Sequence, residues 1–162
     1  LIYIKDYAQT NNMFSACMGY ESIQDNKFIM MNADVFFDAS IIHDLCELEE
    51  DNAIVVDIGN YMVESMKVIE KKGRLTDISK NILPEHALGS SIDVYKFSSN
   101  AGEKFFEKCK DYIEFKGERN LWSEVALNDI LSDVRFVACP MVGRWCEIDN
   151  HEDLEIADRI FG

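Results

Sequence analysis

Two aspartates in this sequence follow short apolar runs, so each is placed where a strand could end at a ligand site. Asp34 closes the stretch 27–34 (KFIMMNAD), and Asp149 closes the stretch 144–149 (RWCEID). In an open α/β sheet, ligands bind beyond the carboxyl ends of the strands. Magnesium prefers oxygen ligands and commonly takes one or two carboxylates together with substrate phosphates. We therefore predict that Asp34 and Asp149 hold one magnesium ion between them.

Each aspartate also has a purely structural interpretation. Asp34 is equally suited to a turn, and Asp149, Asn150 or His151 could cap the helix that is expected to follow. Neither stretch is specific alone. The prediction therefore depends on the two stretches occurring together, in this order.

Four further side chains could contact a substrate. Lys67 and Lys80 lie on or just after a predicted hairpin and could meet a phosphate as point charges, although most lysines are solvated surface residues. Trp122 is either a core residue or the wall of a substrate pocket, and Glu124 either favours a helix N-terminus or faces a substrate. No motif places a serine or cysteine nucleophile beside a histidine, and the 162 residues contain no glycine-rich phosphate loop.

The elements that would position these side chains alternate between strand and helix. This alternation is typical of an α/β fold with a central, mostly parallel sheet. A hairpin is expected over 66–79, turning at Lys72 and Gly73. The other expected strands are 1–6, 27–31, 52–58, 92–97, 134–139 and 144–148, and the expected helices are 12–22, 39–50, 101–115, 121–132 and 151–161. No repeat or linker interrupts the pattern, so we expect one domain over residues 1–162.

Composition narrows the class of protein. Apolar residues make up 48% of the chain and only 2 residues are proline, as in a folded globular protein. No apolar run reaches the roughly 20 residues of a membrane helix, so we expect no membrane partner. The net charge of −14 disfavours nucleic acid as a partner. The 5 widely spaced cysteines predict reduced thiols in a cytoplasmic protein.

Three blocks of the sequence carry a family resemblance. They are 11–15 (NNMFS), 32–34 (NAD), and 147–149 (EID) followed by 152–154 (EDL). Between them lie the shorter matches 66–68 (MKV), 78–80 (ISK), 95–97 (YKF) and 122–124 (WSE). In this order and spacing, the blocks resemble the sugar-phosphate nucleotidyltransferase superfamily, in particular its small cytidylyltransferases for phosphocholine and aminoethylphosphonate. The resemblance covers the whole chain.

The resemblance implies a Rossmann-like, GT-A-like nucleotidyltransferase domain that binds a nucleoside triphosphate, with CTP favoured, and a small phosphate or phosphonate substrate. It implies that Asp34 and Asp149 hold magnesium and that Lys80 is a further catalytic residue. A substrate oxygen would attack the α-phosphorus and pyrophosphate would leave, which requires positioning and charge neutralisation but no protein nucleophile. The residues expected to bind the substrate are Asn11, Asn12, Lys67, Trp122 and Glu124.

The sequence departs from the family in its opening. The family's glycine-rich loop, with its arginine and Pro-Lys pair, is absent, and the chain begins at Leu1. We therefore expect an N-terminally truncated domain, the C-terminal portion of the enzyme, that is inactive alone and whose exposed sheet edge favours a homodimer. Because this loop is absent, the sequence does not determine which nucleotide base is bound. Only Trp122, with Tyr61, offers an aromatic surface to a quaternary ammonium group, so choline, amine and sugar phosphates all stay candidate acceptors.

Two other classes of function stay open. A nucleotide-sugar-dependent glycosyltransferase of related fold would carry Asp-x-Asp, whereas residues 32–34 read Asn-Ala-Asp. Such an enzyme would release a nucleoside diphosphate in place of pyrophosphate. A non-catalytic binding module derived from this fold would have no need to keep both Asp34 and Asp149.

Overall fold

A six-stranded sheet forms the centre of the computed structural model, which describes residues 1–61 and 64–162. The strand order is β5-β4-β6-β3-β7. The long strand β6 has partners on both edges: β3 lies on one edge, and β4 and then β1 lie on the other. The bounds are β1 Phe28–Met31, β3 Ala53–Ile58, β4 Lys67–Glu70, β5 Leu75–Ser79, β6 Gly89–Phe97 and β7 Val137–Pro140.

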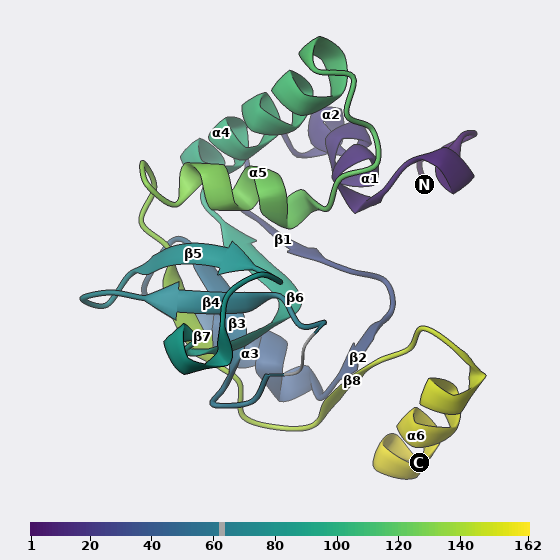
Figure 1. Cartoon of the computed structure of the whole chain (residues 1–162), viewed down its shortest axis with the longest axis vertical. Coiled ribbons are helices and arrows are strands. Elements are labelled where there is room, and N and C mark those ends of the chain that lie inside the picture. The colour runs from purple at the N-terminus through teal and green to yellow at the C-terminus, as the bar shows by residue number, and fades with distance from the viewer. Residues whose placement is uncertain (62–63) are drawn as a thin grey trace.

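Helices cover both faces of this sheet (Figure 1). Alternate side chains of a strand point to opposite faces, so Ile54 and Val56 of β3 enter the core beneath α4 and α5, whereas Val55 packs with Ile41 and Leu45 of α3. This double covering explains why the strands are apolar on both sides. The bounds are α1 Asn12–Met18, α2 Tyr20–Ile23, α3 Ala39–Glu47, α4 Ser99–Lys110 and α5 Ser123–Ile130, with single turns at Tyr7–Gln9 and Pro84–His86 and a π-helix at Asp111–Phe115.

A second, two-stranded sheet lies apart from the first. It pairs β2 (Val35–Phe37) with β8 (Trp145–Glu147) and leads into α6 (His151–Phe161), which projects beyond it in Figure 1. The side chain of Asn150 accepts hydrogen bonds from the N–H groups of Glu152 and Asp153, and the Asp153 carboxylate accepts one from the Asn150 N–H. Asn150 is therefore the N-cap of α6, and the Asp149 carboxylate is not needed for that purpose.

The α/β class is confirmed, but the expectation of a mostly parallel sheet is wrong. Among the described strands only β3 and β7 pair in parallel, and the other pairings are antiparallel. Continuous apolar runs suggested parallel strands because such strands are usually buried on both faces. Here the same burial comes from the helices on either side, whatever the direction of the strand.

Of two local predictions, the hairpin over 66–79 is confirmed and the strand over 1–6 is wrong. The turn of the hairpin uses left-handed backbone at Lys72 (φ 54°) and Gly73 (φ 70°), as tight hairpin turns require. Residues 1–6 pair with no strand in the part of the chain that the structure describes, and Leu1, Ile2 and Tyr3 are exposed. Apolar alternation stabilises a strand only where a neighbour supplies hydrogen bonds and burial.

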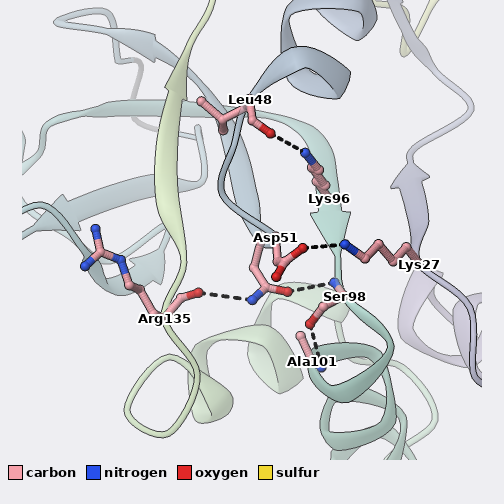
Figure 2. A network of polar contacts seen from close by, with 8 residues as sticks. Lys27, Leu48, Asp51, Lys96, Ser98, Ala101 and Arg135 are labelled. Atoms are coloured by element: carbon pink, nitrogen blue, oxygen red, sulfur yellow. Dashed lines mark hydrogen bonds and ion pairs between the residues drawn. The ribbon is translucent and has the colours of Figure 1, made fainter.

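Polar contacts around the start of β3 hold several elements together (Figure 2). The side chain of Asn52 accepts a hydrogen bond from the Ser98 N–H at 2.7 Å and donates one to the Arg135 carbonyl at 3.2 Å. It thereby connects β3 to the N-cap of α4 and to the segment that enters β7. Beside it, Asp51 pairs with Lys27, next to β1. Within the described residues, no helix is both long and apolar enough to cross a membrane.

Candidate active site

The β2–β8 pair brings the two predicted metal-binding aspartates together. Val35 lies opposite Glu147, and the Ile148 N–H donates a hydrogen bond of 2.9 Å to the Asp34 carbonyl. The start of β2 and the end of β8 therefore lie side by side, and with them Asp34 and Asp149. Candidate ligand oxygens of Asp34, Glu147 and Asp149 all lie within 4.8 Å of one another, on exposed residues. An antiparallel pairing causes this convergence, in place of the two parallel strand ends that we expected.

Glu147 is a site residue that the sequence prediction missed. Its signal was the spacing in Glu147-Ile148-Asp149, because alternate residues of an extended chain point to the same side. Partial burial, and then the nearby Asp149 and Asp34, raise the pKa of Glu147. Such crowding of carboxylates favours binding of a cation. The donors are all oxygens on exposed residues, which leaves space for water and phosphate, so the set fits magnesium.

A cavity of about 390 Å³ adjoins the three carboxylates. Seven of the eight predicted site residues line it: Asn11, Asn12, Asp34, Lys80, Trp122, Glu124 and Asp149. Its acidic lining residues are Asp34, Glu64, Asp93, Glu124, Glu147 and Asp149, whereas Lys80 is the one basic residue among the described residues of the wall. A phosphate ligand would therefore need a metal ion to offset this negative charge.

Lys80 and Trp122 form one side of the cavity. The Lys80 ammonium lies over the Trp122 ring, 4.5 Å from its centroid, in a cation–π arrangement. Trp122 is 44% exposed, so it is a wall residue and not a core residue. A second cavity of about 580 Å³ is also lined by Lys80, Trp122 and Glu124. The two side chains are therefore accessible from both cavities.

Asn11 and Asn12 organise the backbone around the cavity. Asn11 caps α1 through its side chain, which accepts from the Asn12 N–H at 2.8 Å. The Asn12 side chain accepts from the Ser123 N–H at 2.7 Å and donates to the Asn32 side chain at 3.4 Å. It thereby joins α1 to the first turn of α5 and to the loop after β1. Contact of Asn11 or Asn12 with a substrate stays a prediction.

Lys67 is placed differently from the other predicted residues. It lies on β4 and is 2% exposed, and its ammonium group donates to the Ser65 carbonyl at 3.0 Å. It is not among the described residues that line the cavity of about 390 Å³, although Ser65 is. The alternating apolar pattern of the hairpin gave no sign of this burial. Substrate binding by Lys67 stays a prediction.

Asp93, Tyr95 and Glu124 form a polar network at the wall of the cavity, with Tyr95 and Glu124 buried, that the sequence did not reveal. The Tyr95 hydroxyl lies 2.8 Å from Asp93 Oδ1 and 2.6 Å from Glu124 Oε1. Asp93 adopts a left-handed conformation (φ 59°) where the pairing of β6 with β3 is irregular. Burial, and next the neighbouring Glu124, raise the pKa of Asp93 to about 7. A bulge of this kind redirects a side chain, here toward the cavity.

No family model and no curated protein matches the chain, but its fold is similar to solved structures. The inositol-1-phosphate CTP transferase from T. maritima has a TM-score of 0.74 at 15% identity, over 96% of this chain and 63% of that chain. The CTP:phosphocholine cytidylyltransferase from Streptococcus pneumoniae also has a TM-score of 0.74, at 17% identity, over 100% and 68%. An apo-UDP-glucose pyrophosphorylase has a TM-score of 0.71 at 15% identity, over 98% and 62%.

These similarities concern the fold, because each identity is low. The chain spans between 62% and 68% of the length of these three proteins. Nearly all of this chain aligns in each case, so the expected nucleotidyltransferase-like fold is confirmed across its length, although its sheet is mostly antiparallel. This chain has the fold of the sugar-phosphate nucleotidyltransferases.

Proposed function

We propose that this chain carries the metal-binding and acceptor-binding parts of a magnesium-dependent nucleotidyltransferase, which transfers CMP from CTP to a small phosphate or phosphonate substrate. The observation that carries the proposal is the convergence of Asp34, Glu147 and Asp149 beside a cavity that Lys80 also lines. The fold supports it, and two of the similar proteins are named for transfer from CTP. The cytoplasmic location and the homodimer stay predictions.

In the proposed reaction, an oxygen of the acceptor phosphate attacks the α-phosphorus of CTP. A new P–O bond forms, and the bond between the α-phosphorus and the leaving pyrophosphate breaks. A magnesium ion held by Asp34, Glu147 and Asp149 would neutralise phosphate charge at this point. No protein nucleophile is required, which agrees with a cavity lined mainly by carboxylates and amides.

The chain's own residues have two tasks in this scheme. Lys80 supplies a positive charge to the cavity. Its ammonium group would contact a phosphate group and stabilise the negative charge that develops on the leaving pyrophosphate. Trp122 and Glu124 form the wall on which the acceptor head group would lie. The Asn12 side chain connects two segments of that wall through hydrogen bonds to Ser123 and Asn32. A rigid wall keeps the acceptor oxygen in line with the α-phosphorus.

The reaction itself is the test. The natural protein that carries these 162 residues is incubated with magnesium, CTP or UTP, and phosphocholine, phosphoethanolamine, aminoethylphosphonate or a sugar 1-phosphate. We expect pyrophosphate release that is lost in Asp149→Asn and kept in Glu155→Gln, a matched change at an exposed position of α6. Release of a nucleoside diphosphate from a nucleotide sugar would instead identify a glycosyltransferase. Turnover that is unchanged in Asp149→Asn would contradict the assigned site.

A further inference from the structure

The Tyr95 hydroxyl lies between two carboxyl groups that both line the cavity. It is 2.8 Å from Asp93 Oδ1 and 2.6 Å from Glu124 Oε1, and Tyr95 is completely buried. Both distances are those of O–H···O hydrogen bonds. Ser91 approaches the same hydroxyl oxygen at 3.4 Å as a donor.

A tyrosine hydroxyl has one proton and can donate to only one of these carboxyl groups. The second short contact therefore needs a proton from a carboxyl group. Asp93, the carboxyl group whose pKa burial raises, supplies it: Asp93 donates to Tyr95, and Tyr95 donates to Glu124. Burial, and then the nearby Asp93 and Glu124, raise the pKa of Tyr95, so the phenol keeps its own proton. The network consequently holds one shared carboxyl proton.

The surroundings of Asp93 stabilise this arrangement. Asn32 donates to Asp93 Oδ2 at 3.0 Å, and the Asp93 N–H donates to the Ser91 hydroxyl at 3.0 Å. The second bond supports the left-handed backbone of Asp93, which is an uncommon conformation for a residue other than glycine. Strained backbone of this kind persists where surrounding contacts enforce it, often at functional sites.

One oxygen of the network has no partner among the described residues. Glu124 is 3% exposed, and its Oε2 atom is buried without a hydrogen bond, although Glu124 lines the cavity beside Trp122. A buried carboxylate oxygen without a donor is unfavourable, and a ligand that brings positive charge would relieve this. The adjacent indole face of Trp122 also attracts a cation.

We propose that Asp93, Tyr95 and Glu124 are positioning residues that bind a cationic head group of the acceptor, and that binding releases their shared proton to solvent. This inference rests on the proposed function, since it assigns the acceptor to the same cavity. The exchange balances in charge, because one proton leaves as one monovalent cation enters. An uncharged sugar head group would leave the proton in place.

Other charged groups face the network and influence the exchange. Asp34 precedes β2, Glu147 and Asp149 lie at the end of β8, Glu64 precedes β4, and Lys80 follows β5. The carboxylates help to retain the proton, whereas Lys80 and a bound magnesium ion oppose this. Measurements are therefore made both with magnesium and with a chelator.

Choline and its uncharged isostere 3,3-dimethylbutan-1-ol provide a matched pair of probes, because neither titrates near neutral pH. Each is added to the natural protein that carries this chain, in calorimetry at pH 6.5 in two buffers of different ionisation enthalpy. We expect choline to release most of one proton and the isostere to release none and to bind at least tenfold more weakly. Glu124→Gln should weaken choline binding at least tenfold and abolish proton release. Asp93→Asn should also abolish proton release, so the test can still be made if either variant fails to fold.

Enzyme kinetics distinguish a role of this network in acceptor binding from a merely structural role. With phosphocholine as acceptor, KM should fall as the pH rises from 6 to 8, and this pH trend should be absent in Asp93→Asn. Choline binding without proton release, or equal release in Asp93→Asn, would overturn the inference. Pyrophosphate release with a sugar phosphate by a protein that does not bind choline would overturn it too, but would leave the proposed function intact. Proton-coupled choline binding without any transfer from CTP would support the network and count against the transferase.

Discussion

The carbonyl oxygen of Asp34 accepts a hydrogen bond of 2.9 Å from the backbone N–H of Ile148. This contact continues the β2–β8 pairing by one step and places Asp34 beside the chain that leads into Asp149. The candidate metal ligands are therefore attached to a short ribbon, outside the six-stranded sheet. The properties of the site should depend on that ribbon as well as on the carboxylates themselves.

Magnesium should stabilise the folded chain through the three carboxylates. A ligand that binds only the folded state at 100 times its Kd adds about 2.7 kcal/mol to the free energy of unfolding. We expect the Tm to rise with magnesium or manganese and to fall on addition of a chelator. Asp34→Asn and Asp149→Asn should each abolish most of this rise, because each removes a charged ligand without changing volume. The matched control Glu155→Gln should keep it, and an undiminished rise in both aspartate variants would argue against the site.

Lys80 should contribute to the reaction more than to stability. Lys80→Met keeps much of the apolar stem but removes the charge that lies over Trp122 and lines the cavity. We expect kcat to fall at least tenfold with little change in Tm. Lys71→Met, a change in the exposed hairpin turn, serves as the control. If kcat stayed within twofold of the unmodified protein, Lys80 would have no catalytic role.

The Asp38–Arg144 ion pair should support the ribbon. The Arg144 guanidinium donates to both carboxylate oxygens of Asp38, at 2.8 and 3.1 Å, and lies 4.8 Å from the Phe161 ring centroid. The pair thus connects the two strands of the ribbon to α6. Because the pair lies at the surface, where water and salt screen the two charges, its coupling free energy should be modest.

A double-mutant cycle measures that coupling from the unfolding free energies of Asp38→Ala, Arg144→Ala and the double variant. The same variants should weaken metal binding several-fold, since the ribbon then holds Asp34 and Glu147 less firmly. A coupling free energy of zero together with unchanged metal affinity would show that the pair does not support the site.

Asp93 should make the stability of the protein depend on pH. Its pKa is raised from 3.8 to about 7 in the folded state, chiefly by burial, so between these values the folded state binds a proton that the unfolded state lacks. The stabilising contribution is complete below pH 4 and is lost as the pH rises through about 7. The limit of this effect is on the order of 4 kcal/mol.

Asparagine at this position cannot ionise, so Asp93→Asn should become more stable relative to the unmodified protein as the pH rises from 4 to 8. Denaturant unfolding at several pH values, with a chelator present, provides the comparison. Asp77→Asn, a change at a strand position outside the cavity wall, is the control. Parallel curves for the unmodified protein and Asp93→Asn would contradict the raised pKa.

Local structure was largely predictable from the sequence. The hairpin turn at Lys72 and Gly73 was identified because the left-handed backbone it requires is favoured by glycine. The later helices followed from their apolar periodicity, since α4 and α5 each bury one face. Asp34 and Asp149 could be selected because a carboxylate directly after an apolar run is conspicuous. All of these features depend on neighbours within a few positions along the chain.

Pairings between distant segments were decided only by the tertiary structure. The sequence pattern did not reveal that β6 runs antiparallel to β3, because helices on both faces give every central strand the same apolar composition. Nor did it show that Glu147 joins the two aspartates, or that Lys67 is buried. Tyr95 could be placed between Asp93 and Glu124 only once β6 was packed against α5. Residue types and apolar periodicity can be read from neighbouring positions in the sequence. Proton sharing and metal coordination depend on distances between side chains, which only the packing of distant segments sets.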